Sequence, residues 1–167
     1  CDKTVAARRA LDDFYDKKNI KISSISNEQL LQFYSYMLET YYKKCRDAIK
    51  KIAPNKLYLG SRLHDGALRK EAFSAAAKYC DVVSVNVYEK DVKKFNVQLD
   101  RDKPFFTEDV PFLVGEFDFG SLDRGKFFSG IGFAADQRNR GECMEYFIES
   151  ALENPRCVGC LLYTSDA

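Results

Sequence analysis

The chain has 167 residues, of which 26 are Lys or Arg and 25 are Asp or Glu, so its formal net charge is +1. This balance argues against a partner held by bulk electrostatics, such as a nucleic-acid backbone or an anionic membrane surface. Hydrophobic residues make up 46% of the chain, enough for one core, and no apolar run approaches the ~20 residues of a membrane span. We therefore expect one folded domain that binds neither nucleic acid nor membrane.

The first third of the chain predicts two helices. Residues 4–18 place apolar side chains near helical spacing, whereas residues 20–25 are short and Ser-rich and predict a connector. Ser26 and Gln29 form the S-x-x-Q pattern of a capping box, which predicts the start of a long amphipathic helix. Pro54 is expected to end that helix.

After Pro54 the pattern alternates between strands and helices. We expect strands at 56–62, 81–88, 111–119 and 156–163, and helices over 67–79 and 136–154. The polar residues 89–109 predict at most a partial helix. This order favours parallel strands buried by crossover helices, and therefore the α/β class.

Polar residues lie at the carboxyl ends of the predicted strands: Arg62, His64, Asn86, Tyr88, Glu116 and Asp118. Neither a dinucleotide-binding glycine fingerprint nor a P-loop is present. Polar groups at that rim are how (β/α)8 TIM barrels build active sites, but a whole barrel takes about 250 residues. The prediction is a partial (β/α)8 barrel, roughly half of one.

Glu116 is the strongest candidate for a catalytic residue, because it interrupts the apolar strand LVGEFDFG. Burial of a carboxylate costs free energy unless partners stabilise it. Tyr88 and Asn86 alternate with valines and point to one side of their strand, so Tyr88 could donate a hydrogen bond to Glu116. The alternative is structural: a rim carboxylate paired with Arg62 or Arg124, beside a core tyrosine and asparagine.

Other motifs predict no separate chemistry. His64 is the only histidine and no G-x-S-x-G elbow occurs, which argues against a Ser/His/Asp hydrolase. Cys157 and Cys160 form one C-x-x-C, whereas a structural zinc site needs four ligands, so we predict isolated thiols and no metal. The kinase-like tripeptide at 118–120 lacks every companion motif and is interpreted as coincidence.

The stretch PFLVGEFDFGSLDRGKFFSG, residues 111–130, resembles the seventh-strand region of glycoside hydrolase family 50, the β-agarases. The family pattern there is G-E-F-H-F-G followed by an L-D-R-G loop. The resemblance extends to SVNVYE at 84–89, to APNKLYLGSRL at 53–63 and forward over 136–159, so that it covers about 40–159. It implies barrel strands five to eight with their flanking helices.

The resemblance also implies a reaction. Glu116 matches the family's catalytic nucleophile, and the implied activity is retaining hydrolysis of β-1,4 galactosidic bonds in agarose-type polysaccharide. The substrate would be a galactan polysaccharide or oligosaccharide, bound by Arg62, His64, Asn86, Tyr88 and Asp118. No cofactor is implied, because two carboxylates suffice for this chemistry. A secreted or periplasmic location is expected, since a polysaccharide gel cannot enter a cell.

Three departures from the family pattern matter. Asp118 stands where the family has His, which leaves the polysaccharide open. The family's general acid/base is the Glu of an Asn-Glu pair ending the fourth strand, whereas Asn27-Glu28 opens a helix here. The matching position is expected before Cys1, so the chain alone should be inactive.

The third departure is the C-terminus. The last eight residues, CLLYTSDA, look like a translated sequencing adapter. We therefore expect residues 1–159 to be the carboxyl-terminal half of a glycosidase barrel and residues 160–167 to be non-native.

Three other interpretations remain open. The same barrel could carry a β-galactosidase or another retaining β-glycosidase. It could also be a non-catalytic, polysaccharide-binding pseudoenzyme. Finally, the chain could be an unrelated open α/β binding domain, in which Glu116 would lie far from Tyr88.

Overall fold

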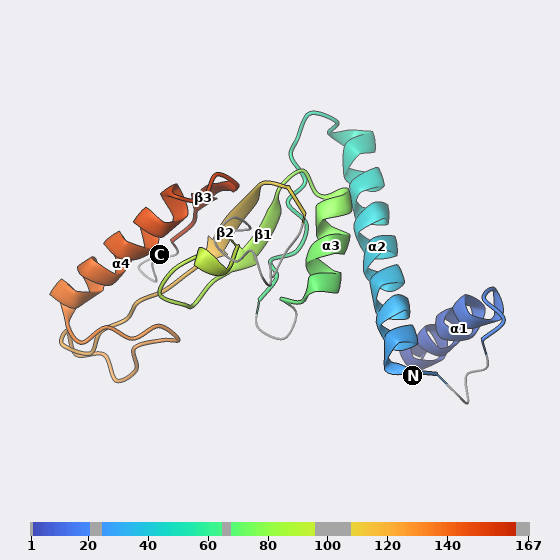
Figure 1. The fold of residues 1–167 in the computed structure, drawn as a ribbon, viewed down its shortest axis with the longest axis horizontal. Helices are drawn as coiled ribbons and strands as arrows, with labels where there is room; N and C mark the ends of the chain where they lie inside the picture. Colours follow the sequence, from blue (N-terminus) through green and yellow to red (C-terminus); the bar gives the residue numbers. More distant parts are fainter. Residues whose placement is uncertain (1, 21–24, 65–67, 96–107, 163–167) are drawn as a thin grey trace.

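The structure is a computed structural model, and it describes residues 2–20, 25–64, 68–95 and 108–162. Two helices open the chain, α1 (Asp2–Asp16) and α2 (Asn27–Ile52). They lie side by side at one end of the molecule (Figure 1). Their contact is a small aromatic cluster of Phe14, Tyr15 and Phe33. The Tyr15 hydroxyl donates to the Gln29 carbonyl at 2.8 Å, which satisfies the polar end of a fully buried ring.

The long helix begins at the predicted capping box. Ser26 Oγ accepts a hydrogen bond from the Gln29 backbone N–H at 3.2 Å, and the Gln29 side chain accepts one from the Ser26 N–H at 2.8 Å. The helix ends at Ile52, two residues before Pro54, as predicted. One face of α2 packs against α3 (Lys70–Tyr79), whose buried alanines allow a close approach. None of the helices in the described ranges is long and apolar enough to cross a membrane.

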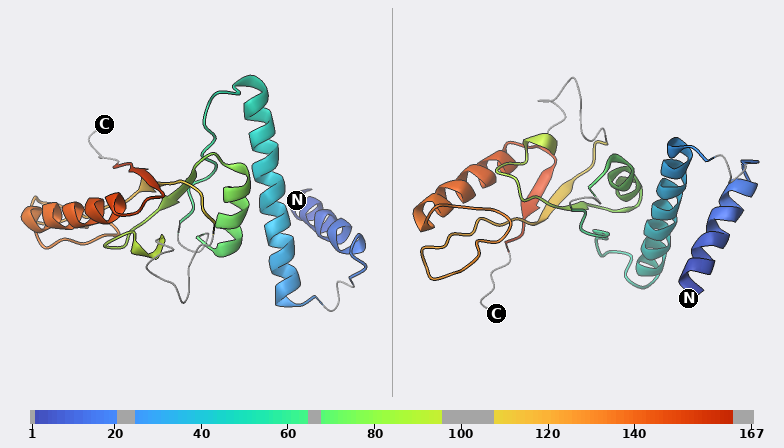
Figure 2. Two further views of the ribbon diagram at one scale, coloured as in Figure 1. Left: turned by 45° about the horizontal axis from the view of Figure 1, so that its top comes forward. Right: turned by 90° about the horizontal axis from the view of Figure 1, so that it is seen from below.

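Three parallel strands form the sheet: β1 (Val83–Asn86), β2 (Phe112–Glu116) and β3 (Cys157–Cys160), in the spatial order β1-β2-β3. The short 3-10 helix η3 (Lys93–Phe95) follows β1, and α4 (Gln137–Leu152) connects β2 to β3. Figure 2 shows α2 and α3 at one end of the sheet and α4 at the other. The α/β class with a parallel sheet is therefore confirmed.

One predicted strand does not form. Residues 56–62 have no strand structure, and the residue that follows them, Leu63, makes an isolated parallel bridge to Val85 of β1. Gly60 adopts a φ of 66°, a left-handed conformation that interrupts an extended chain. The Tyr58 N–H bonds the Asp81 side chain at 2.7 Å and so takes no strand partner. The other predicted strands form around their centres, with shorter ends.

The core lies on the side of the sheet that the helices cover. Val83, Val85 and Val87 are fully buried there, in one cluster with residues of α3 and α4. Phe117 stacks on Phe147 of α4 with ring centroids 4.5 Å apart and an interplanar angle of 3°. The face of the sheet that carries these valines is thus buried in the core, and the polar side chains lie on the opposite face.

Candidate active site

The Glu116 carboxylate lies at the carboxyl end of β2 and accepts hydrogen bonds from three side chains. The Tyr88 hydroxyl donates to Oε1. The Asn86 amide donates to Oε2 at 3.3 Å, and Arg62 Nη1 donates to the same oxygen at 3.2 Å. These residues come from three neighbouring parallel segments. Four of the six residues that the sequence analysis names therefore meet at one point, and the predicted Tyr88–Glu116 contact forms.

A β-bulge aims the carboxylate. Val85 pairs with Val114, but the next residue, Asn86, pairs with Glu116, so that Gly115 is an extra residue in β2. Paired residues in a parallel ladder point to the same face. Glu116 consequently shares the polar face with Asn86. Bulges commonly re-aim a side chain beside an active site.

Arg62 joins the backbone of the bulge to the carboxylate. Its Nη1 donates to the Gly115 carbonyl at 3.1 Å as well as to Glu116. The Arg62 and Glu116 side chains are 44% and 36% exposed. Exposed ion pairs contribute only about 0–1 kcal/mol to stability. The consequence of this contact is therefore orientation of the carboxylate.

Tyr88 is held in its protonated, donating form. Burial of the phenol raises the pKa of Tyr88 above its ordinary value, and the hydrogen bond and negative charge of Glu116 raise it further, against smaller opposing effects of Asn86 and Arg62. An ionised carboxylate can only accept hydrogen bonds, so a neutral phenol is its natural partner. The result is a fixed, partly exposed carboxylate, which is suited to nucleophilic attack.

The other two predicted site residues are not among the hydrogen-bond or ion-pair partners of Glu116 in the described part of the chain. His64 is exposed, and no hydrogen bond or ion pair between described residues joins it to Glu116. Asp118 is half-buried beyond the end of β2, and its carboxylate lies against Gly130 in the loop 121–135. Arg124, the other arginine considered as a partner of Glu116, is exposed in that loop.

Gly115 was not among the site residues predicted from the sequence. Its signal is the spacing of the apolar residues in β2 and beyond: Phe112, Val114, Phe117 and Phe119 are all buried. A regular strand would continue in steps of two, and the step of three across Gly115 indicates the bulge.

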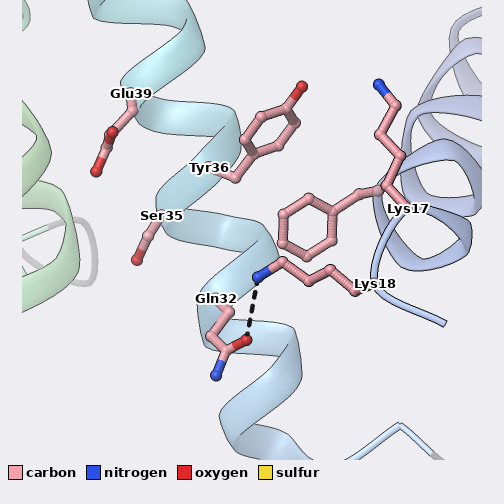
Figure 3. A pocket seen from close by; sticks show the side chains of 7 residues that line it. Lys17, Lys18, Gln32, Ser35, Tyr36 and Glu39 are labelled. Atoms are coloured by element: carbon pink, nitrogen blue, oxygen red, sulfur yellow. Dashed lines mark hydrogen bonds between the residues drawn. The ribbon is translucent and has the colours of Figure 1, made fainter. Parts of the chain in front are cut away.

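A hollow of about 560 Å³ lies elsewhere, between α1 and α2 (Figure 3). Phe14 and Tyr36 form an aromatic wall, and Lys18 reaches Gln32 across it at 3.5 Å. The helices α1 and α2 that border it form one end of the molecule (Figure 1), whereas the polar cluster lies at the carboxyl ends of β1 and β2. Within the described ranges, no three His, Cys, Asp or Glu side chains are grouped to hold a metal ion.

No protein-family model matches the chain. The chain is 35% identical over 147 residues to beta-agarase B of Vibrio sp. (strain JT0107), which covers 86% of this chain and 15% of that protein. It is similar in structure to an exo-beta-agarase, with a TM-score of 0.71, 33% identity and coverage of 81% of this chain and 18% of the other. It is also similar to the protein BpGH50, with a TM-score of 0.76, 32% identity and coverage of 95% and 35%.

These similarities agree with the resemblance in residues 111–130, and they extend it over most of the chain. The chain spans less than a fifth of the length of the curated relative. On its sequence and its fold together, the chain belongs to the β-agarase family, glycoside hydrolase family 50.

Proposed function

We propose that the chain is part of the catalytic domain of a retaining glycoside hydrolase that cleaves β-1,4 galactosidic bonds in agarose-type polysaccharide. The observation that carries the proposal is the Glu116 carboxylate at the end of a parallel strand, held by Tyr88, Asn86 and Arg62. The similarity to beta-agarase B supports the same class of substrate. Glu116 is the proposed nucleophile.

The proposed architecture is the carboxyl-terminal half of a (β/α)8 barrel. The strands follow one another in chain order across the sheet, and Leu63 continues that order on the free side of β1. Sequential parallel order is the pattern of a barrel, whereas a doubly wound sheet reverses its order at a switch point. The polar cluster lies at the carboxyl ends of the strands, where barrel enzymes carry their sites.

The mechanism follows from this placement. A Glu116 oxygen attacks the anomeric carbon while a general acid protonates the departing glycosidic oxygen, which leaves a glycosyl ester on Glu116. Water, deprotonated by the same acid/base residue, then attacks the anomeric carbon and releases Glu116. Retention requires the two carboxyl groups about 5–5.5 Å apart. Tyr88, Asn86 and Arg62 would hold the nucleophile in line with the sugar.

The general acid/base that this mechanism needs has no match among the described residues. The Asn27-Glu28 pair opens α2, at the helical end of the molecule. We therefore propose that the acid/base residue belongs to a longer protein, and that the 167-residue chain alone has no turnover. Robust hydrolysis of agarose by this chain would contradict that proposal.

The test uses the longer protein, with the gene extended on both sides. Glu116→Gln should lower kcat on agaro-oligosaccharides by about 1,000-fold or more, because no nucleophile remains. Glu116→Ala with added azide should recover turnover and release an α-glycosyl azide, since azide replaces the missing carboxylate on the opposite face. The matched control is Glu142→Gln, an exposed carboxylate on α4 that contacts its helical neighbours Arg138 and Asn139. Full activity of Glu116→Gln would refute the proposal.

One observation favours a second candidate. Asp118, two residues after Glu116, stands where the family pattern has His, so the sugar next to the nucleophile could differ. A panel of agarose, porphyran and aryl β-galactosides separates a β-agarase from another retaining β-glycosidase. Tight binding with no hydrolysis on the whole panel would indicate a polysaccharide-binding pseudoenzyme.

A further inference from the structure

We infer that Gly115 is a positioning residue for Glu116: the absence of a side chain at 115 lets Arg62 reach across β1 and hold the bulge that turns the carboxylate into the site. This inference rests on the proposed function for its meaning in catalysis. Its geometric content stands separately. Gly115 does not contact the sugar in this proposal and acts only through Arg62 and Glu116.

The side chains beside the bulge point to two different faces of the sheet. Ser84 pairs with Leu113 and Asn86 with Glu116, so these four side chains share the polar face. If β2 kept regular alternation, with Gly115 and not Glu116 paired to Asn86, residue 116 would lie on the face that carries Val85 and Val114. That face is the fully buried core. The bulge is therefore what separates a polar-face carboxylate from a buried one.

There is no room for a side chain at Gly115. A Cβ atom there would lie 2.6 Å from Arg62 Cδ and 2.6 Å from Ser84 Oγ, closer than side-chain carbons approach. Gly115 is not among the glycines with positive φ, so its backbone dihedrals admit other residues. The requirement for glycine is thus the close passage of the Arg62 side chain.

Neither Arg62 nor Ser84 can move away from a side chain at residue 115 without disturbing the site. The Arg62 guanidinium is fixed by the Gly115 carbonyl and by Glu116, at 3.1 and 3.2 Å. Ser84 is buried on the central part of β1, so it has little room to rotate. A side chain at 115 must displace Arg62 from Glu116 or flatten the bulge. Either movement releases the carboxylate from its position.

The first test needs no activity and uses the 167-residue chain. Tyr88 reports on Glu116, because the hydrogen bond and charge of that carboxylate add to burial in raising the pKa of Tyr88, with Arg62 acting weakly in the opposite direction. With ¹³C-labelled tyrosine, assigned through Tyr88→Phe, Gly115→Ala should bring the Tyr88 pKa down toward its ordinary value. The control is Gly141→Ala, an α4 glycine with open space around its Cβ position, which should leave the Tyr88 pKa unchanged.

The second test uses the longer protein. Gly115→Ala should lower kcat by about 100-fold, as expected for a misplacement of about 1 Å, with a much smaller change in KM. In an Arg62→Ala/Ser84→Ala background, where both colliding groups are gone, Gly115→Ala should lower kcat far less, so that the effects of the substitutions are not additive. Activity and Tyr88 pKa both unchanged in a folded Gly115→Ala protein would overturn the inference.

Folding and the proposed function are controlled separately. If Gly115→Ala does not fold, as judged by circular dichroism, the comparison moves to Arg62→Ala/Ser84→Ala with and without Gly115→Ala. An equal Tyr88 pKa in these two proteins supports a steric collision at residue 115 as the cause. A large difference between the two pKa values contradicts it. A longer wild-type protein without turnover would refute the proposed function, whereas the titration would still decide the role of Gly115.

Discussion

The Tyr88 phenol and the Glu116 carboxylate form a hydrogen bond between neighbouring strand ends. Tyr88 lies two residues beyond Asn86, so both point to the polar face, and the pairing of Asn86 with Glu116 sets the carboxylate beside them. The raised pKa of Tyr88 keeps the phenol protonated at neutral pH, and the donated proton is lost as the pH rises through that pKa. The contact is therefore intact at neutral pH.

Tyr88→Phe in the longer protein should lower kcat by about 10- to 100-fold, since a hydrogen bond to a charged group is worth about 1.5–3 kcal/mol. The loss should fall on kcat more than on KM, because the bond orients the nucleophile. Steady-state kinetics on an agaro-oligosaccharide measures it. Tyr146→Phe, which removes an exposed phenol bonded to Lys93, is the control and should keep full activity. Equal kcat for Tyr88→Phe and wild type would contradict the positioning role.

Much of the fold follows from local chemistry that is visible in the sequence. The capping box at Ser26 and the proline after α2 fix that helix, because both act within one helical turn. Strand centres are recognisable where valines alternate with polar residues, as in β1. The cluster of Arg62, Asn86, Tyr88 and Glu116 follows from the rule that parallel strands end at a common edge.

The remaining features depend on contacts between distant segments. The sequence analysis expected a strand at 56–62, but the backbone N–H of Tyr58 bonds Asp81, and Gly60 turns left-handed beneath the Tyr42 ring. At the bulge, the Gly115 carbonyl accepts a hydrogen bond from Arg62, 53 residues earlier in the chain. Neither contact has a local signature strong enough to override the strand pattern. The proposal that residues 160–167 are non-native stays a prediction, and 163–167 lie outside the described residues.

Asp81 is expected to stabilise the fold, because it lies just before β1 and contacts residues of α2. Its carboxylate accepts hydrogen bonds from the Tyr58 N–H at 2.7 Å and pairs with Lys50 at 2.8 Å and Arg46 at 3.3 Å. The hydrogen bond from Lys50, and then that from Tyr58, hold the pKa of Asp81 below its ordinary value. Asp81→Asn should lower the free energy of unfolding at pH 7 by about 1–3 kcal/mol.

The stabilisation by Asp81 should depend on pH in one direction. A lowered folded-state pKa stabilises the protein above the unfolded pKa, and that stabilisation is lost as the pH falls through the folded value. The difference between wild type and Asp81→Asn in urea unfolding should therefore shrink on acidification below pH ~4. The control is Asp47→Asn, an exposed partner of Lys43, which should change stability by less than about 0.5 kcal/mol. A constant difference across this pH range would contradict the role of the Asp81 charge.

The capping box at Ser26 should contribute to the stability of α2. Ser26→Ala removes the acceptor for the Gln29 N–H and should lower the free energy of unfolding by about 1 kcal/mol. Ser26→Asp keeps an acceptor next to the positive end of the helix dipole and should restore the loss. Thermal unfolding of the three proteins measures the effect. If Ser26→Ala were as stable as wild type, or Ser26→Asp as destabilised as Ser26→Ala, the cap would contribute nothing to stability.

The loop 121–135 should make the 167-residue chain self-associate. Phe127 and Phe128 are adjacent and largely exposed, and Ile131 and Phe133 of the same loop are exposed as well. Apolar side chains gathered on one surface favour association, whereas an isolated apolar residue does not. Phe127→Ser/Phe128→Ser should therefore lower the weight-average mass in sedimentation equilibrium. Leu57→Ser, which removes a single exposed side chain from another segment, should leave that mass unchanged. A wild-type chain that sediments as a monomer at every concentration would contradict the prediction, since the loop would then be exposed without a partner.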